Sequence, residues 1–157
     1  MSALSILRSA IIAVSLLFAA IAASVAVAGS VNEVQGLAIK GFDPVAYFID
    51  QKAVPGSAEF THPYDGVTYR FSSAAHRDAF IANPQKYLPA YGGFCAFGTA
   101  SGYKADIDPK AFTVVDGKLY LNYNQDVRSK WQQDIPGYIK TADEKWPTVS
   151  KSTDVIR

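Results

Sequence analysis

Two stretches of the chain alternate apolar and polar side chains with the two-residue period of a half-buried β-strand. In the first, residues 67–71 read Val-Thr-Tyr-Arg-Phe and follow the stretch 58–62 across a Pro-Tyr-Asp-Gly segment. In the second, residues 111–115 and 118–122 are joined by Asp116-Gly117. The alternation on either side of residues 63–66 predicts a β-hairpin in the first stretch. In the second, the Asp-Gly pair readily takes positive φ in a type I′ turn, which also predicts a β-hairpin.

Three further segments place apolar residues three or four positions apart, the spacing of a helix that buries one face: 73–83, 125–135 and 139–146. Side chains that can cap a helix start precede the first two segments, namely Ser72 or Ser73 and Asn124. A proline follows each segment and is expected to end the helix: Pro84, Pro136 and Pro147. Together the patterns predict a small, single α+β domain with two β-hairpins and about three short helices.

Residues 1–28 have the pattern of an export signal and lack the strand and helix patterns of the domain. Arg8 precedes an apolar run over 10–23, and Ala26-Val27-Ala28 has the small-x-small pattern that signal peptidase cleaves. Residues 1–28 are therefore expected to be a signal peptide that directs the domain to the periplasm or outside the cell. Because the apolar run approaches the length that crosses a bilayer, an uncleaved anchor that tethers the domain to the inner membrane is the alternative.

Charge and cysteine content narrow the classes of function. Lysine and arginine together number 15 against 14 acidic residues, so the chain has no strong field to attract nucleic acid. The single cysteine, Cys95, cannot form an internal disulfide. Cys95 is left as a buried, metal-bound or reactive residue, or as one paired with another molecule.

The segment 64–87, from Tyr-Asp-Gly-Val-Thr-Tyr-Arg-Phe to Asn-Pro-Gln-Lys-Tyr, resembles the YHS domain. The positions that match its aromatic and proline pattern are Tyr69, Phe71, Phe80, Pro84 and Tyr87. Upstream, Asp43-Pro44-Val45 resembles the opening of that family, and the downstream segments 91–96, 106–109 and 131–147 resemble an exported bacterial branch of unassigned function. The resemblance implies a YHS-like domain over 43–147, which leaves a lead-in over 29–42. The last residues, 148–157, are expected to form a flexible tail.

Many YHS domains accompany copper and heavy-metal transport proteins, so the resemblance implies a transition metal or a metal-handling partner. The metal-linked form carries three cysteines, and this chain has Ala46, Ser72 and His76 at those positions. The remaining candidate ligands for copper or zinc are Cys95, His76 and His62, which are the soft and borderline donors that such metals prefer. The alternatives are a histidine at the edge of the core, an exposed histidine at a strand end and a cysteine that packs as a small apolar residue.

An aromatic cluster gives a second hypothesis without a metal. Tyr69, Tyr91 and Phe94 are expected to contribute to a small-ligand pocket, although core packing explains large aromatic side chains equally well. A third hypothesis is a thiol enzyme with Cys95 as nucleophile and His76 as base. The sequence favours a binding module over an enzyme.

Overall fold

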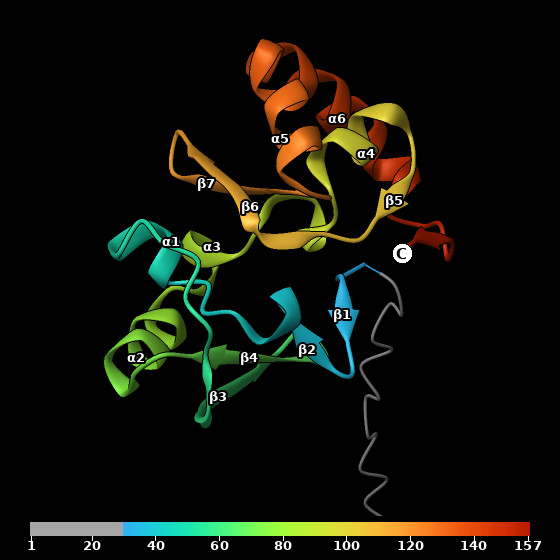
Figure 1. Ribbon diagram of the computed structural model, residues 1–157. Coiled ribbons are helices and arrows are strands. Elements are labelled where there is room, and N and C mark those ends of the chain that lie inside the picture. The colour runs from blue at the N-terminus through green and yellow to red at the C-terminus, as the bar shows by residue number, and fades with distance from the viewer. Residues whose placement is uncertain (1–29) are drawn as a thin grey trace, which may run out of the picture.

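The computed structural model describes residues 30–157, and the predicted signal peptide over 1–28 lies outside the described residues. Figure 1 shows three helices, α4, α5 and α6, gathered at one end of the molecule, with α2, β3 and β4 at the other. The hairpin β6–β7 lies between these ends. None of the helices within 30–157 is both long and apolar enough to cross a membrane.

A four-stranded sheet forms the first half of the domain. Its strands are β1 (Glu33–Val34), β2 (Leu37–Ala38), β3 (Ser57–Tyr64) and β4 (Val67–Phe71). They are arranged in the order β1-β2-β4-β3, with only the β2–β4 pair parallel. The accompanying helices are the 3₁₀ turn η1 (Ile39–Gly41), α1 (Ala46–Ile49), α2 (Ala74–Ala82) and α3 (Pro84–Tyr87).

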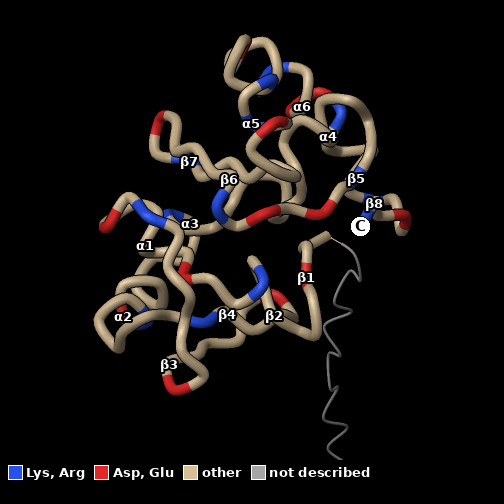
Figure 2. The backbone as a smooth tube through the Cα atoms, viewed as in Figure 1, with Lys and Arg blue, Asp and Glu red and all other residues tan. Residues whose placement is uncertain are grey.

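The second half packs helices against a two-stranded hairpin. Its strands are β6 (Asp108–Val115) and β7 (Lys118–Asn122), and a separate parallel pair joins β5 (Lys104–Ala105) to β8 (Val155–Ile156). The helices are η2 (Ala90–Gly93), α4 (Ala96–Ser101), α5 (Gln125–Trp131), η3 (Gln132–Asp134) and α6 (Ile135–Val149). Figure 2 shows basic and acidic residues interspersed along both halves.

The structure confirms both hairpins, and the second turn has the backbone geometry that its Asp-Gly pair predicts. The first turn has the same geometry. Asp65 and Gly66 have φ of 53° and 81°, and Asp116 and Gly117 have φ of 50° and 74°. Positive φ at both central residues gives the turn a twist that matches the strands it joins. Leu119 and Leu121, on β7, are buried as expected, and Tyr120 between them is buried as well, so this strand is covered on both faces.

The helix caps are also confirmed, but two of the expected helix ends are wrong. The Ser73 Oγ accepts the N–H of His76, and the Asn124 Oδ1 accepts the N–H of Val127. Pro136 does not end a helix: it lies in the first turn of α6, where a missing N–H costs nothing because that group has no partner inside the helix. Pro147 lies within α6, which continues to Val149.

Three short helices, α1, α3 and α4, were absent from the sequence prediction. Each has four to six residues, which is too short for an apolar period to be recognised.

The C-terminal residues differ from the flexible tail expected over 148–157. Val155 and Ile156 pair with β5, and the N–H of Asp106 donates to the carbonyl of Ile156. The buried Lys104 donates through its Nζ to the carbonyls of Ser150 and Ser152 at 2.9 and 2.6 Å. This pairing joins segments about fifty residues apart in the chain, so no local pattern could indicate it.

Two hydrophobic clusters form the interior. The first joins the sheet to α2 and the hairpin and includes Phe71, Phe80 and Leu121. The second lies under α5 and α6 and contains Tyr120, Trp131 and Ala142. Cys95 belongs to the first cluster, so the thiol lies inside the domain.

Candidate functional sites

The carboxylate of Asp43 is fully buried and accepts five hydrogen bonds. The N–H groups of Val45 and Ala46 donate to Oδ1 at 2.8 and 3.3 Å. The N–H and hydroxyl of Ser72 donate to Oδ2 at 2.8 and 2.7 Å, and the Nδ1 of His76 lies 2.7 Å from the same oxygen. Asp43 therefore joins the start of α1 to the junction between β4 and α2.

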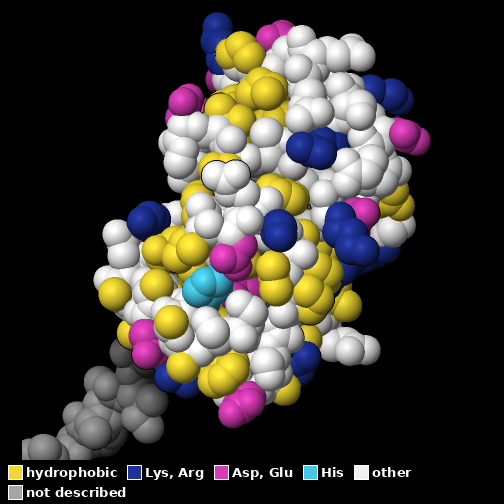
Figure 3. Space-filling model, turned by 60° about the vertical axis from the view of Figure 1, so that its left-hand side comes forward, with side chains coloured by type: hydrophobic (Ala, Val, Ile, Leu, Met, Phe, Trp, Pro, Cys, Tyr) yellow, Lys and Arg dark blue, Asp and Glu magenta, His cyan; other side chains and the backbone are white. Residues whose placement is uncertain are grey.

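His76 is held by this carboxylate with one ring nitrogen left available. A carboxylate accepts hydrogen bonds, so Nδ1 carries the hydrogen in this arrangement and Nε2 is the free atom. Nε2 lies 4.0 Å from Oδ2 of Asp50, whose side chain is 42% exposed. Figure 3 shows one face of the molecule, on which hydrophobic, basic and acidic side chains are mixed. A histidine held in this way can bind a metal or transfer a proton through Nε2.

Cys95 is the residue that caps α4, and its environment disfavours the thiolate. Its Sγ accepts the N–H of Gly98 at 3.4 Å and donates to the Oδ1 of Asn122 at 3.7 Å. Burial raises the pKa of the thiol, and the hydrogen bonds from Gly98 and its neighbours lower that pKa by less. A helix start acts to lower the pKa of a thiol, but at Cys95 desolvation dominates and the pKa is raised.

The three predicted metal ligands are not joined into one centre. The polar partners of Cys95 are Asn122 and Gly98, while His76 contacts Asp43, Ser72 and Asp50. His62 lies on β3, and its ring and that of Phe80 form a T-shaped pair with a centroid distance of 6.3 Å. Within residues 30–157, no three side chains among His, Cys, Asp and Glu are grouped so that they could hold a metal ion.

The three predicted pocket residues are buried core residues, and Tyr69 belongs to a different cluster from Tyr91. Tyr69 belongs to the first hydrophobic cluster and Tyr91 to the second. Phe94 is 1% exposed and packs between Trp146 and the Nζ of Lys104, which lies 4.9 Å from its ring centre. Their large side chains are explained by packing.

A different aromatic pocket opens beside Cys95. It has a volume of about 270 Å³, and its lining includes Cys95, Phe97, Tyr103, Tyr123 and Ile156. The last three are large apolar residues that are 40%, 39% and 53% exposed. The pocket is therefore an apolar hollow that is open to solvent at its rim.

Asn122 contacts two residues that line this pocket, and its side chain has an unused donor. Its side chain is fully buried, and its Oδ1 accepts from two residues of the lining, the Sγ of Cys95 and the N–H of Phe97. Its Nδ2 has no hydrogen-bond partner among the described residues. A buried amide without a partner costs about 1 to 3 kcal/mol, so a ligand or water that accepts from Nδ2 is favoured there.

Sequence reasoning missed Asp43 and Asn122 as site residues. Asp43 was noticed only as part of an Asp-Pro-Val opening, and its partners Ser72 and His76 lie about thirty positions away. Asn122 stands at the end of a predicted strand, where an asparagine carries no local signal.

Comparisons with known proteins give no further guide, since no family model, curated protein or solved structure matches this chain.

Proposed function

We propose that this chain is a binding module, not an enzyme, and that a small, neutral, largely apolar molecule occupies the Cys95 pocket. The observation that supports this proposal is the solvent-open hollow lined by Phe97, Tyr103 and Tyr123. The buried Asn122, whose Nδ2 has no partner among the described residues, contacts the lining residues Cys95 and Phe97. Binding sites for small molecules have this composition, with apolar walls and few polar groups that fix the orientation of the ligand.

The lining restricts the chemistry of the ligand. None of the residues that line the pocket is charged, so an ion would lose its hydration there without a partner. A cavity of about 150 Å³ holds benzene, so a pocket of about 270 Å³ accommodates one ring with a short substituent. A carbonyl on that substituent would accept a hydrogen bond from Nδ2 of Asn122.

A thiol enzyme is disfavoured by the same surroundings. The pKa of Cys95 is raised by burial, so the thiol is protonated at neutral pH. Its polar partners are an amide oxygen and a backbone N–H, and neither can act as a general base.

Acetophenone, a ring with one carbonyl, is a suitable probe, and ethylbenzene is the matched compound without an acceptor. We expect saturable binding of acetophenone with a Kd of about 1 mM or tighter, followed by heteronuclear NMR. The side-chain NH₂ signals of Asn122 should shift with acetophenone and not with ethylbenzene. Tyr123→Ala should weaken binding, while Ile49→Ala, which removes an apolar side chain that is 57% exposed elsewhere, should not.

Two outcomes would end the proposal. One is the absence of saturation by either compound up to its solubility limit. The other is that the NMR shifts caused by acetophenone are the same in Tyr123→Ala and in Ile49→Ala as in the wild type.

A second candidate function is weak binding of copper or zinc through Nε2 of His76 and the carboxylate of Asp50. The observation that favours it is the buried Asp43, because a histidine that donates Nδ1–H to a carboxylate presents an oriented and more basic Nε2 to a metal. In this proposal the chain is an exported YHS-like protein that acts with a metal-transport partner in the periplasm. Cleavage after Ala28 would give a mature protein that begins at Gly29, which mass spectrometry of the exported protein would detect.

Metal binding is tested by titrating the protein, purified without a histidine tag, with Zn²⁺ and Cu²⁺ in a calorimeter. We expect one ion per chain in the wild type and weaker binding in Asp50→Asn, whose fold should be intact because Asp50 is partly exposed. His62→Gln is the matched histidine control and should bind like the wild type. Equal losses in His62→Gln and Asp50→Asn, or no binding tighter than about 1 mM in the wild type, would exclude this candidate.

A further inference from the structure

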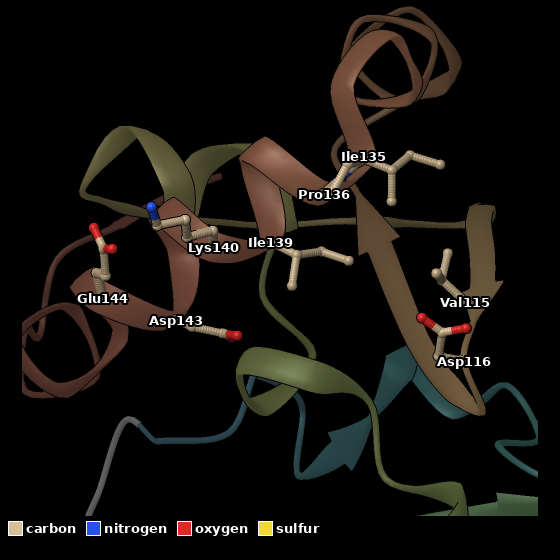
Figure 4. A pocket seen from close by; sticks show the side chains of 8 residues that line it. All are labelled: Val115, Asp116, Ile135, Pro136, Ile139, Lys140, Asp143 and Glu144. Carbon is tan, nitrogen blue, oxygen red and sulfur yellow. The ribbon is translucent and has the colours of Figure 1, made fainter.

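A second pocket lies between the tip of the β6–β7 hairpin and helix α6 (Figure 4), and it has a volume of about 590 Å³. Val115 and Asp116 line it from the hairpin, and Ile139 and Asp143 line it from the helix. Figure 4 shows Ile139 and Asp143 directed from α6 toward the hairpin, so the two elements face each other across the hollow. It shares no lining residue with the Cys95 pocket.

The floor of this pocket is apolar and well supported. Val115, Ile135 and Ile139 are partly buried residues that pack against the second hydrophobic cluster. The cluster below them contains Trp131, which is fully buried, and Tyr120. An apolar body in the pocket would therefore rest on a surface that is already packed.

The rim carries an excess of negative charge. Three carboxylates, those of Asp116, Asp143 and Glu144, line the pocket with one cation, Lys140. Among residues 30–157, none of the three carboxylates forms an ion pair. The charge of this rim is therefore not neutralised by the domain itself.

Asp143 is held in place by a neighbour that leaves one of its oxygens available. The Tyr91 hydroxyl donates to Oδ1 of Asp143 at 2.9 Å. Burial raises the pKa of Tyr91, and the hydrogen bond to Asp143 raises it further, so the phenol remains a donor. Oδ2 has no hydrogen-bond partner among the described residues and can accept from a ligand.

We propose that this pocket binds a small organic cation, an ammonium group carried on an apolar body. The apolar part would lie on Val115 and Ile139, and the ammonium group would donate to the carboxylates of Asp143 and Asp116. Charge complementarity selects this class, because an anion would be repelled by the rim and a neutral molecule would gain nothing from it. The site adds a second ligand class to the neutral molecule proposed for the Cys95 pocket.

Three probes of nearly equal shape separate charge recognition from simple apolar contact: 2-phenylethylammonium, 2-phenylethanol and phenylacetate. Titration of the purified protein, followed by NMR, should give saturable shifts for Ile139 and Val115 with the ammonium compound. The alcohol should bind at least about twofold to fivefold more weakly, which corresponds to the loss of one partly exposed charge pair. Phenylacetate should not saturate.

The variant Asp143→Asn keeps an oxygen that can accept from Tyr91 and removes the negative charge. It should weaken the binding of the ammonium compound by about twofold to fivefold and leave the Kd of the alcohol unchanged. Glu59→Gln, which removes an exposed negative charge on β3, is the matched control and should leave the Kd unchanged. Equal affinities for the ammonium compound and the alcohol, or equal effects of Asp143→Asn and Glu59→Gln, would overturn the proposal.

Discussion

Replacing Asp43 with asparagine is expected to be among the most destabilising single changes in this domain, although it alters only one atom of the side chain. The asparagine has one oxygen and one NH₂ group where the aspartate has two oxygens. If the oxygen faces Val45 and Ala46, the NH₂ group faces the Ser72 N–H, which donates at 2.8 Å in the wild type. Two donors then oppose each other in a fully buried position.

The magnitude follows from the partners of Oδ2. The Ser72 hydroxyl and the His76 ring can reorient to accept from an NH₂ group, but the backbone N–H of Ser72 cannot. One buried donor without a partner costs about 1 to 3 kcal/mol, and a hydrogen bond to a charged group contributes about 1.5 to 3 kcal/mol. A total loss of about 3 kcal/mol is therefore expected, which for a domain of this size lowers Tm by about 10 °C.

The assay is thermal and urea unfolding of Asp43→Asn beside Asp50→Asn, in which the altered carboxylate is 42% exposed. Asp50→Asn should change stability by less than about 0.5 kcal/mol. Ser72→Ala, alone and combined with Asp43→Asn, completes a double-mutant cycle in which the two changes should be strongly non-additive. A fall in Tm below about 3 °C for Asp43→Asn, or full additivity with Ser72→Ala, would refute the reasoning.

Three other predictions concern single groups. Gly92→Ala should lower the free energy of unfolding by about 2 kcal/mol or more, since the new Cβ would clash with the carbonyl of Ser30. Gly117 has a similar φ but open space around it, so Gly117→Ala should lower the free energy of unfolding, measured in urea, by only about 1 kcal/mol. Burial acts to raise the pKa of Asp106, but hydrogen bonds and a lysine partner lower it overall from 3.8. Its contribution to stability should be complete above about pH 4 and disappear as the pH falls through the lowered pKa, and Asp106→Asn should remove that part of the pH dependence. Iodoacetamide should alkylate Cys95 at least about tenfold more slowly in the native than in the unfolded protein at pH 8, and equal rates would contradict its burial.

The sequence by itself determined the elements that depend on a few adjacent residues. Asp116-Gly117 closes its hairpin because both residues take positive φ, and Ser73 and Asn124 begin helices because their oxygens accept an N–H three residues away. These effects act within four residues and do not depend on the rest of the fold. The α+β class follows from them.

The sites depended on the tertiary structure. Asp43 meets Ser72 and His76 across 29 and 33 positions, and Cys95 meets Asn122 across 27. Burial then decided the chemistry. At Cys95, desolvation raises the pKa of the thiol by more than the hydrogen bonds at the helix start lower it. Tyr69, Tyr91 and Phe94 are buried in the core. The identity of a residue limits which bonds it can make, but only the folded chain sets its partners and its exposure to water, and those decide which groups remain free to bind.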